Sequence, residues 1–402
     1  MNVKNLYIAC LSLLLCACSP EPPLHLYDEG EVALDLPVID LDLHVYWDYT
    51  MAYGTDYNWE SEWYYGWDED DRTLFGELGY VEPSVFNLRR YYTGEQAMQP
   101  HLAVRSATIN GTHFRGSYDW GFWDILCWND IHTLDGIQSL IFDEKSSLDY
   151  VTAYTRETMH ASRYNAPMYT HAFYAPEPLF AAYEQGIEIN RNLDGFVFNE
   201  EENVWVRTLN MQLEPITYIY LTQIILHNNK GRMASIDGSS NLSGMARSTT
   251  LNTGLAGTDA ITVAYSARMK HNVPYVPYNS PAASAAGAER VDIIGGRLMT
   301  FGIPGIAANR IGRSEKVKDN HRHYLDVNVQ FQNGMDSTLV FDVTEQVRRR
   351  YKGGVLTIEL DVDTIPIPQR AGGSGFDAVV REVEDGGTHE FELTRRKQRS
   401  KH

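Results

Sequence analysis

Apolar and polar residues alternate in several short stretches of this chain. Residues 40–47 read DLDLHVYW, with an apolar residue at every second position, and the same spacing returns at 325–331 and 356–362. Successive side chains of a strand point to opposite faces of a sheet, so a repeat of two indicates a strand with one buried face. The pattern predicts half-buried β-strands at these three places.

Asn-Gly pairs mark two tight turns between predicted strands. Asn110-Gly111 stands between SATI and THF, and Asn333-Gly334 stands between LDVNVQFQ and MDSTLVF. The two-residue turns of hairpins need positive φ, which Asn and Gly adopt most readily. We therefore expect a β-hairpin at each pair.

Helix signals are few. Short helices are expected at 178–184 and at 342–351, where Asp342 and Glu345 have the spacing of a capping box and Gly353-Gly354 supplies the end. Many short strands with few helices indicate an all-β fold of Greek-key β-sandwiches.

A chain of 402 residues is long enough for two domains. The polar run NEEENV separates two strand-rich halves, which predicts two tandem β-sandwiches at 34–198 and 199–393, followed by a basic tail at 394–402. This tail is either a solvated end or a contact with a membrane or partner.

The N-terminal segment has the layout of an export signal. A basic residue, Lys4, precedes an apolar stretch that is too short to span a bilayer of about 30 Å. Leu15, Cys16, Ala17 and Cys18 then form a lipobox, which predicts a lipoprotein signal peptide at 1–17 with Cys18 as the lipidated residue. The alternative is an ordinary signal peptide that happens to contain cysteines.

A lipid on Cys18 would hold the protein to a membrane through an extended tether at 18–33, which is rich in proline and acid. Cys127 is the only other cysteine of the mature chain, so no disulfide framework is expected. We interpret it as a buried small apolar residue. The net charge of −19 excludes nucleic acid as a partner, because phosphates would be repelled.

Candidate chemistry is weak. His321 and His323 are two residues apart and would face the same way in a strand, but no third ligand stands at a recognisable spacing, so polar surface histidines are the favoured interpretation. The acid runs at 68–71 and 200–202 lack the register of a calcium loop. No catalytic motif is present, so we expect no enzyme, no cofactor and no metal site.

One aromatic segment stands out between two predicted strands. Residues 57–71 read YNWESEWYYGWDEDD and contain the five candidate ligand-contact residues Trp59, Trp63, Tyr64, Tyr65 and Trp67. Exposed aromatic rings beside carboxylates would suit a glycan-stacking or protein-docking loop. The alternative is an insertion whose aromatic side chains fold back over a sheet as a lid on the core.

Several longer motifs resemble a known family. They are NNKGRMASIDGSSNLSGMARSTTLNTG at 228–254, GGRLMTFGIPG at 295–305, FDVTEQVRRRYKGGVLTIELDVDTIPIP at 341–368 and GFDAVV at 375–380, joined in the first half by FNLRRYY, GFWDILCWN and PEPLFAAYEQG. With these motifs the chain resembles the fimbrillin-type lipoproteins of Bacteroidales, which are related to fimbrial anchor and accessory subunits.

The resemblance implies two transthyretin-like β-sandwiches, a lipid-anchored place on the surface of the outer membrane, and a role in fimbrial assembly, anchoring or adhesion. Fimbrial subunits or other surface proteins would be its partners, joined by β-strand pairing at sheet edges. A glycan-binding surface lipoprotein that uses the aromatic segment is the alternative function.

Two features favour an anchor or accessory role over a shaft subunit. A polymerising subunit of this family releases its N-terminal segment by cleavage after a basic residue, and the first Lys or Arg after Cys18 is Arg72. The C-terminal end carries the basic tail, where a donatable apolar strand would be expected, and the apolar stretch before it, FEL, is short.

Overall fold

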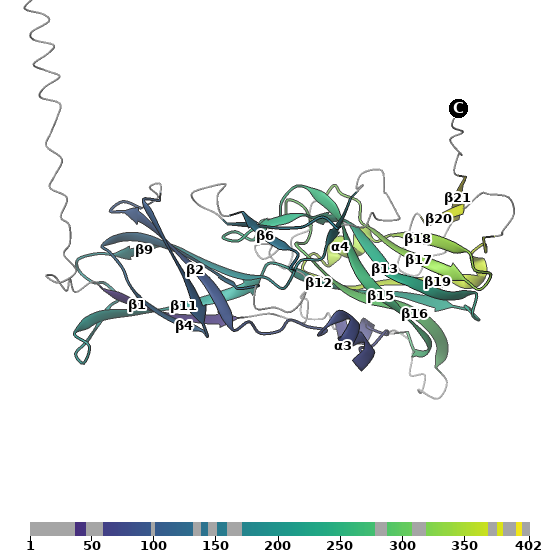
Figure 1. Ribbon diagram of the computed structural model, residues 1–402, viewed down its shortest axis with the longest axis horizontal. Coiled ribbons are helices and arrows are strands. Elements are labelled where there is room, and N and C mark those ends of the chain that lie inside the picture. The colour runs from purple at the N-terminus through teal and green to yellow at the C-terminus, as the bar shows by residue number, and fades with distance from the viewer. Residues whose placement is uncertain are drawn as a thin grey trace, which may run out of the picture.

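A computed structural model describes residues 37–45, 59–97, 101–131, 138–143, 151–158, 171–277, 288–307, 319–368, 376–380 and 391–395. The described residues form two large curled sheets and a small one, with few helical turns between them (Figure 1). The all-β fold class is confirmed, while the Greek-key and transthyretin-like details stay predictions. The described residues contain no helix that is long and apolar enough to cross a bilayer.

The first domain is built on an eight-stranded sheet in the order β3-β2-β5-β9-β11-β1-β4, with β10 paired to β11. Its strands are β1 (Val38–Val45), β2 (Val85–Gly94), β3 (Ala103–Asn110), β4 (His113–Ser117), β5 (Gly121–Asn129), β9 (Phe180–Ile189), β10 (Val197–Asn199) and β11 (Val204–Pro215).

The core of the first domain lies inside this curled sheet. It holds Ile39, Phe86, Trp123, Phe180 and Met211 from five different strands, each of them buried. Strand β1 lies between β11, to which it is parallel, and β4, to which it is antiparallel.

The second domain is built on a ten-stranded sheet in the order β19-β12-β16-β15-β13-β17-β18-β20-β21, with β8 paired to β15. Its strands are β8 (Ala172–Tyr174), β12 (Tyr218–His227), β13 (Met233–Ala246), β15 (Ala260–Tyr275), β16 (Glu289–Thr300), β17 (Tyr324–Phe331), β18 (Asp336–Asp342), β19 (Gly354–Asp361), β20 (Phe376–Val380) and β21 (Phe391–Arg395).

Two of the strands predicted from alternation form the core of the second domain. Leu325, Val327, Val329 and Phe331 of β17 are all buried, as are the apolar positions of β19. The Asn333-Gly334 hairpin is confirmed, since β17 and β18 pair across it and Gly334 has φ +74°. A helix is confirmed at α4 (Thr344–Arg349), but its N-cap is Val343 and not the predicted Asp342.

The two domains are interleaved along the chain. A small three-stranded sheet joins β6 (Leu140–Asp143) and β7 (Thr152–Thr155) from the first half to β14 (Ser248–Thr250) from the second. Beneath it, Leu126 and Trp128 of β5 share one apolar cluster with Leu251 and Phe301 of the second domain. The two domains are therefore held together by side-chain packing in addition to the covalent chain.

Three sequence predictions are wrong in detail. The Asn110-Gly111 turn does not close a hairpin, because β3 pairs with β2 and β4 pairs with β1 at the other end of the sheet. The helix expected at 178–184 is the start of β9, where pairing with β5 overrides local preference. The boundary predicted at 198 falls inside the β10–β11 hairpin, and the chain passes to the second sheet only at Ile216–Thr217.

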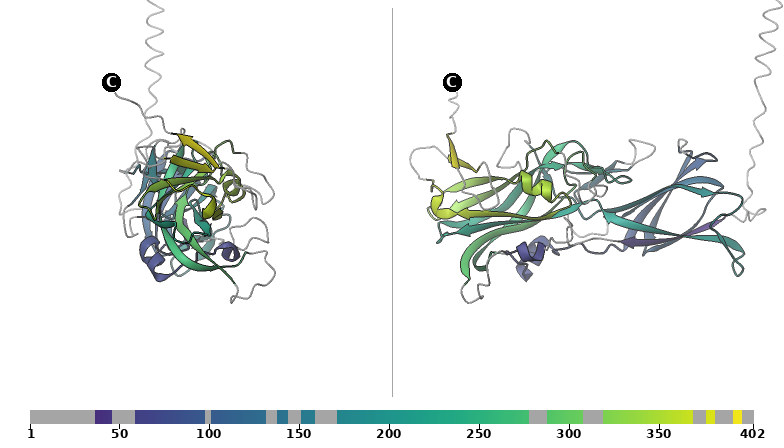
Figure 2. Two further views of the ribbon diagram at one scale, coloured as in Figure 1. Left: turned by 90° about the vertical axis from the view of Figure 1, so that its right-hand side faces the viewer. Right: turned by 180° about the vertical axis from the view of Figure 1, so that it is seen from behind.

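The molecule is elongated, with the two domains in line (Figures 1 and 2). Strand β1 lies in the first domain, and β20 and β21 lie at the far end of the second domain. The first and last strands of the described chain are therefore near opposite ends of the long axis.

Candidate functional site

The aromatic segment crosses from the first domain to the second. Residues 59–80, which connect β1 to β2 and are here named the strap, carry α2 (Trp59–Glu62) and α3 (Glu69–Phe75). Figure 1 shows α3 beside the second domain, although the strands on either side of the strap belong to the first domain. The strap is thus a loop of one domain that covers the outer face of the other.

Trp59 is the first apolar anchor of the strap. Its side chain is 8% exposed and packs in one cluster with Ile219 and Leu221 of β12, Met299 of β16 and Val355 of β19. These strands bury their opposite faces in the core of the second domain. Trp59 therefore shields from water a second apolar face of the same sheet.

Tyr65 is the second anchor, and it is only 2% exposed. It packs with Ile225 of β12, Val291 and Ile293 of β16, and Tyr275 of β15. Burial and the hydrogen bond from its hydroxyl to Asp71 raise the pKa of Tyr65 well above its usual range.

The side chains of the other three candidate ligand-contact residues also face the sheet of the second domain. Trp63, Tyr64 and Trp67 are partly buried against the cluster around Tyr65. The indole N–H groups are satisfied within the strap, from Trp63 to the carbonyl of Gly66 at 3.1 Å and from Trp67 to that of Gly76 at 3.2 Å. The five aromatic residues form a lid over a sheet, which is the second of the two interpretations of this segment.

Gln223 of β12 fixes the strap to the sheet by hydrogen bonds. Its Oε1 accepts from the backbone N–H groups of Tyr64 at 2.9 Å and Tyr65 at 3.2 Å, and its Nε2 donates to the carbonyl of Glu62 at 2.5 Å. The side chain is fully buried, so each lost bond would leave a buried polar group unpaired. Nothing in the sequence marks this glutamine, which stands in an apolar strand.

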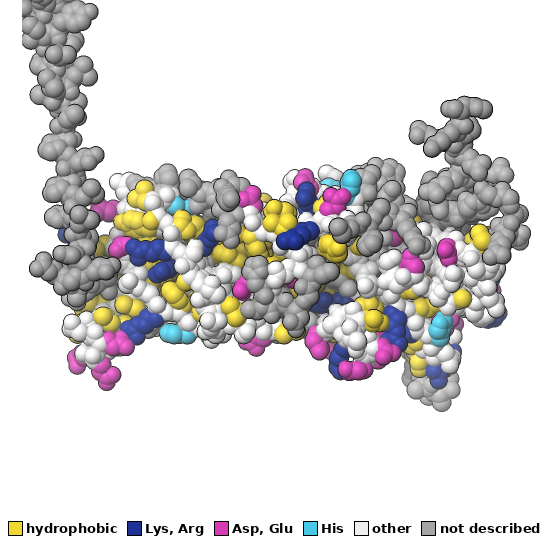
Figure 3. All heavy atoms as spheres, viewed as in Figure 1, with side chains coloured by type: hydrophobic (Ala, Val, Ile, Leu, Met, Phe, Trp, Pro, Cys, Tyr) yellow, Lys and Arg dark blue, Asp and Glu magenta, His cyan; other side chains and the backbone are white. Residues whose placement is uncertain are grey.

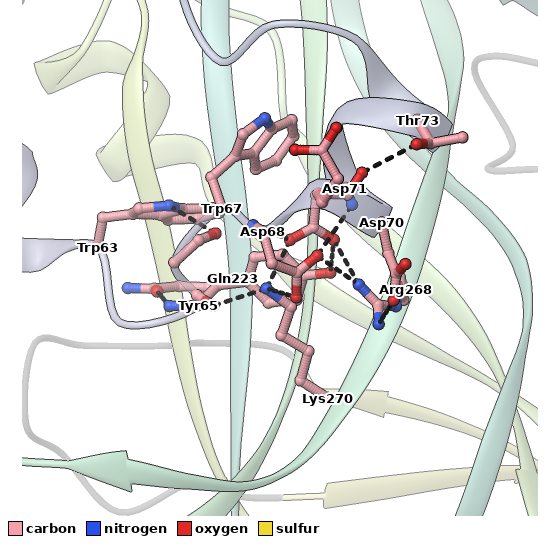
Figure 4. Close-up of polar contacts among 12 residues, drawn as sticks. Trp63, Tyr65, Trp67, Asp68, Asp70, Asp71, Thr73, Gln223, Arg268 and Lys270 are labelled. Atoms are coloured by element: carbon pink, nitrogen blue, oxygen red, sulfur yellow. Dashed lines mark hydrogen bonds and ion pairs between the residues drawn. The ribbon is translucent and has the colours of Figure 1, made fainter.

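The acidic residues of the strap form ion pairs with two basic side chains of the sheet (Figure 4). Arg268 of β15 contacts Asp68 at 2.9 Å, Asp71 at 3.0 Å and Asp70 at 2.8 Å, and Lys270 contacts Asp68 at 3.0 Å and Asp71 at 2.5 Å. We name these five residues the clasp. Acidic side chains gather over α3 on the surface of the molecule (Figure 3).

Asp71 is the buried centre of the clasp. Its side chain has no exposure, and it also accepts from the Tyr65 hydroxyl at 2.8 Å and from the backbone N–H of Asp68 at 2.9 Å. Asp68 is the N-cap of α3 and accepts in turn from the backbone N–H of Asp71, which completes a capping box. Burial disfavours the charge on Asp68, but this N–H and the two cations outweigh it and lower the pKa of that carboxyl.

This arrangement determines what the acid run can do. Each of the three carboxylates of the clasp is paired with a guanidinium or ammonium group, and these two cations offset most of the negative charge of the acid run. The described residues hold no group of three or more His, Cys, Asp or Glu side chains placed for a metal ion. The geometry suits fastening a loop to a sheet better than binding calcium or transferring a proton.

The two histidines of HRHY share one carboxylate. Asp319 accepts from His321 at 2.9 Å and from His323 at 2.8 Å, and burial is outweighed by these bonds, so the pKa of Asp319 is lowered. His323 is fully buried, so the prediction of surface histidines is wrong for this residue.

Of the two cysteines expected in the mature chain, the structure describes one. Cys127 is fully buried in the first core, as predicted, and burial raises the pKa of its thiol. Cys18, the signal peptide at 1–17 and the tether at 18–33 lie outside the described residues, as does the tail beyond residue 395.

No family model and no curated protein matches the sequence. Among solved structures, the chain is similar to a candidate adhesin from Bacteroides ovatus, with 12% identity, a TM-score of 0.43, and coverage of 83% of this chain and 94% of that one. It is similar to the fimbrial anchor protein Mfa2 from Porphyromonas gingivalis, with 9% identity, a TM-score of 0.37, and coverage of 88% and 95%.

A third similar structure is the tip fimbrial protein Mfa3 from Porphyromonas gingivalis, with 8% identity, a TM-score of 0.28, and coverage of 78% of this chain and 93% of that one. All three are distant in sequence and superpose only in part. They are adhesin-like and fimbrial proteins, the kinds of protein that the sequence motifs of this chain resemble.

Proposed function

We propose that this protein is a non-enzymatic, lipid-anchored surface protein of the fimbrillin type that serves as an anchor or accessory subunit in fimbrial assembly or adhesion. The observation that carries the proposal is the elongated body, with β1 in one domain and β20 and β21 at the far end of the other. If Cys18 carries a lipid, the chain would run from the membrane into the first domain at β1. The second domain would then point away from the membrane.

The joining of the two domains supports this role. The strap, β8 and β14 each bring a segment of one half of the chain onto the other half. A connector between a membrane and a filament needs such a body, because a flexible joint would lose the orientation of its far end.

Sheet edges offer the means of attachment. Strand β3 ends the path of the first sheet, and its Val104 is 47% exposed beside Leu102, which is 65% exposed. An edge strand presents backbone donors and acceptors that an incoming strand can satisfy. We infer that partner subunits pair with edges of this kind.

Site-specific photo-crosslinking in native cells tests the proposal. A benzophenone side chain at Val104 on the β3 edge should capture fimbrial subunits, identified by mass spectrometry. The matched control is the same side chain at Leu74 in α3, which is 61% exposed but lies on no sheet edge. Equal capture at both positions, or capture of glycan-uptake proteins alone, would contradict the proposal.

The membrane anchor is tested separately. Incorporation of an alkyne-labelled fatty acid should be lost in Cys18→Ala and retained in Cys16→Ala. Label that persists in Cys18→Ala would place the lipid elsewhere and remove the anchor from the proposal.

A further inference from the structure

A cavity of about 320 Å³ opens on the outer face of the first sheet. It is lined by residues of β2, β3 and β5 of the first sheet, by Asp130 just after β5, and by Phe142 of β6 in the small sheet, and none of its lining residues belongs to the strap or the clasp. Small-molecule sites typically measure about 300–1,000 Å³, so this cavity is of a size for a small unit such as one or two sugar rings.

The floor of the cavity is a square of four polar side chains on two paired strands. Asn87 and Arg89 of β2 lie directly across from Thr108 and Ser106 of β3. Their neighbours Phe86 and Leu88 point into the core, so the four polar residues share the opposite face. We name these four residues the polar floor.

The polar floor is held in place before any ligand arrives. Residues directly opposite on paired strands have Cβ atoms about 4.5–5.5 Å apart, and a rigid sheet fixes their spacing. The hydroxyl of Thr108 lies 3.5 Å from Oδ1 of Asn87. Hydroxyl, amide and guanidinium groups in one layer can donate and accept together, as adjacent hydroxyls on a ring require.

An aromatic wall stands beside the floor. Phe142 of β6 is partly exposed and supplies the accessible ring of this wall. Behind it, with ring centroids 6.2 Å apart, lies Trp128 of β5, the cross-strand neighbour of Asn87, which is only 4% exposed. The guanidinium of Arg89 lies 6.0 Å from the Trp128 ring centroid, and Asp130 adds a carboxylate at the end of β5.

We infer that this cavity is a binding site for a neutral sugar unit. An apolar wall beside a fixed layer of hydrogen-bonding groups matches a pyranose ring, which has apolar C–H faces and a polar rim of hydroxyls. The charged residues among those that line the cavity are one cation, Arg89, and one anion, Asp130, so its local charge is balanced and a neutral ligand fits it better than sialic acid, uronic acid or phosphate. The site is separate from the aromatic segment of the strap, where the sequence placed glycan binding.

Saturation-transfer difference NMR tests the inference on the full-length protein. The probes are glucose, galactose, mannose, fucose and N-acetylglucosamine, each at about 5 mM. At least one should show transfer, and the double variant Asn87→Ala with Thr108→Ala should abolish it. The signal should also fall by at least tenfold in Arg89→Met.

The matched control changes another cross-strand polar pair in the second domain. Ser235→Ala with Gln330→Ala removes a 3.2 Å side-chain hydrogen bond between β13 and β17 and should leave sugar binding unchanged. Circular dichroism of each variant reports folding. Absence of transfer for all five sugars, or transfer that survives the floor variant, would overturn the inference without affecting the proposed surface role.

Discussion

The ring of Tyr65 occupies the space that a side chain at Gly295 would fill. A Cβ atom on Gly295 would lie 2.3 Å from Cδ2 of Tyr65 and 2.4 Å from its Cγ. Gly296, one residue on, faces the other way, where a Cβ would lie 2.9 Å from the Tyr265 ring in the core. The Gly-Gly pair thus lets one aromatic ring lie on each face of β16.

Gly295→Ala should therefore loosen the strap. Because the clash involves the base of the Tyr65 ring, the ring cannot avoid it by a small rotation, and we expect a loss of about 1–3 kcal/mol in the free energy of unfolding. Urea denaturation would measure it. In the Tyr65→Ala background the same change should cost far less, and equal costs in both backgrounds would rule out this packing.

Asp71→Asn should be the most damaging single change in the clasp. It leaves Lys270, which is 13% exposed, and Arg268, which is 28% exposed, without their buried partner. Breaking a buried ion pair on one side costs about 3–5 kcal/mol. Asp70→Asn is the control, since the Asp70 side chain is 74% exposed and such pairs contribute about 0–1 kcal/mol. Similar urea midpoints for the two variants would contradict a buried role for Asp71.

Arg72 should resist trypsin in the folded protein. Its side chain is half exposed, but its backbone lies in the capped helix α3 next to buried Asp71, and a protease needs an extended, locally unfolded segment. Arg191, in an exposed turn after β9, should be cut before Arg72. Mass spectrometry of timed digests would show it, and cleavage at Arg72 should rise by at least tenfold in Asp71→Asn. Rapid cleavage at Arg72 in the unchanged protein would instead favour a processed subunit.

His227 should make stability depend on alkaline pH. The carboxylate of Glu359, 3.6 Å from Nε2, and that of Glu289, hydrogen-bonded to Nδ1 at 3.1 Å, raise the pKa of His227 to about 9, against the opposing effect of burial. The charged form is favoured in the folded state, so its stabilisation is fully present below pH 6.5 and is lost as the pH rises through 9. The glutamates are about half exposed, so we expect about 1–2 kcal/mol.

The comparison that isolates this effect is the difference between unchanged protein and His227→Gln at pH 6 and pH 10. The difference should be largest at pH 6 and nearly vanish at pH 10. His271→Gln, at a side chain that is 56% exposed, is the control. A difference that stays constant across this range would exclude titration of His227 as its cause.

The strands could be predicted from local pattern, and the strap could not. The burial of the apolar positions of β17 and β19 follows from a repeat of two, but the predicted exposed face does not hold for β17, since Asp326 and Asn328 between those positions are buried as well. The partners of Tyr65, by contrast, stand about 160–230 positions further along the chain. No local rule links the acids of the strap to Arg268 and Lys270, although two cations on one face of a strand hint at an anion nearby.

The predictions for the first half of the chain are wrong where strand pairing determines the structure. Residues 180–189 have helix-compatible composition at their start, yet they pair with β5 along most of its length. The turn at Asn110-Gly111 has the chemistry of a hairpin, but its two strands continue to opposite ends of the sheet. Local chemistry indicates that the chain turns and does not specify which strand comes to lie beside it.

The order β1, strap, β2 also determines how tension would travel. A pull on the first residue of β1 acts along a strand that is bonded on both sides, by β11 and β4, so the hydrogen bonds are loaded together in shear. The next described segment along the chain is the strap, which is fastened to the second domain by the clasp, Gln223 and the aromatic anchors. If the chain is anchored at Cys18 as proposed, a pulling force would enter the first domain at β1 and reach the second domain through the strap as well as through the strands that flank β1.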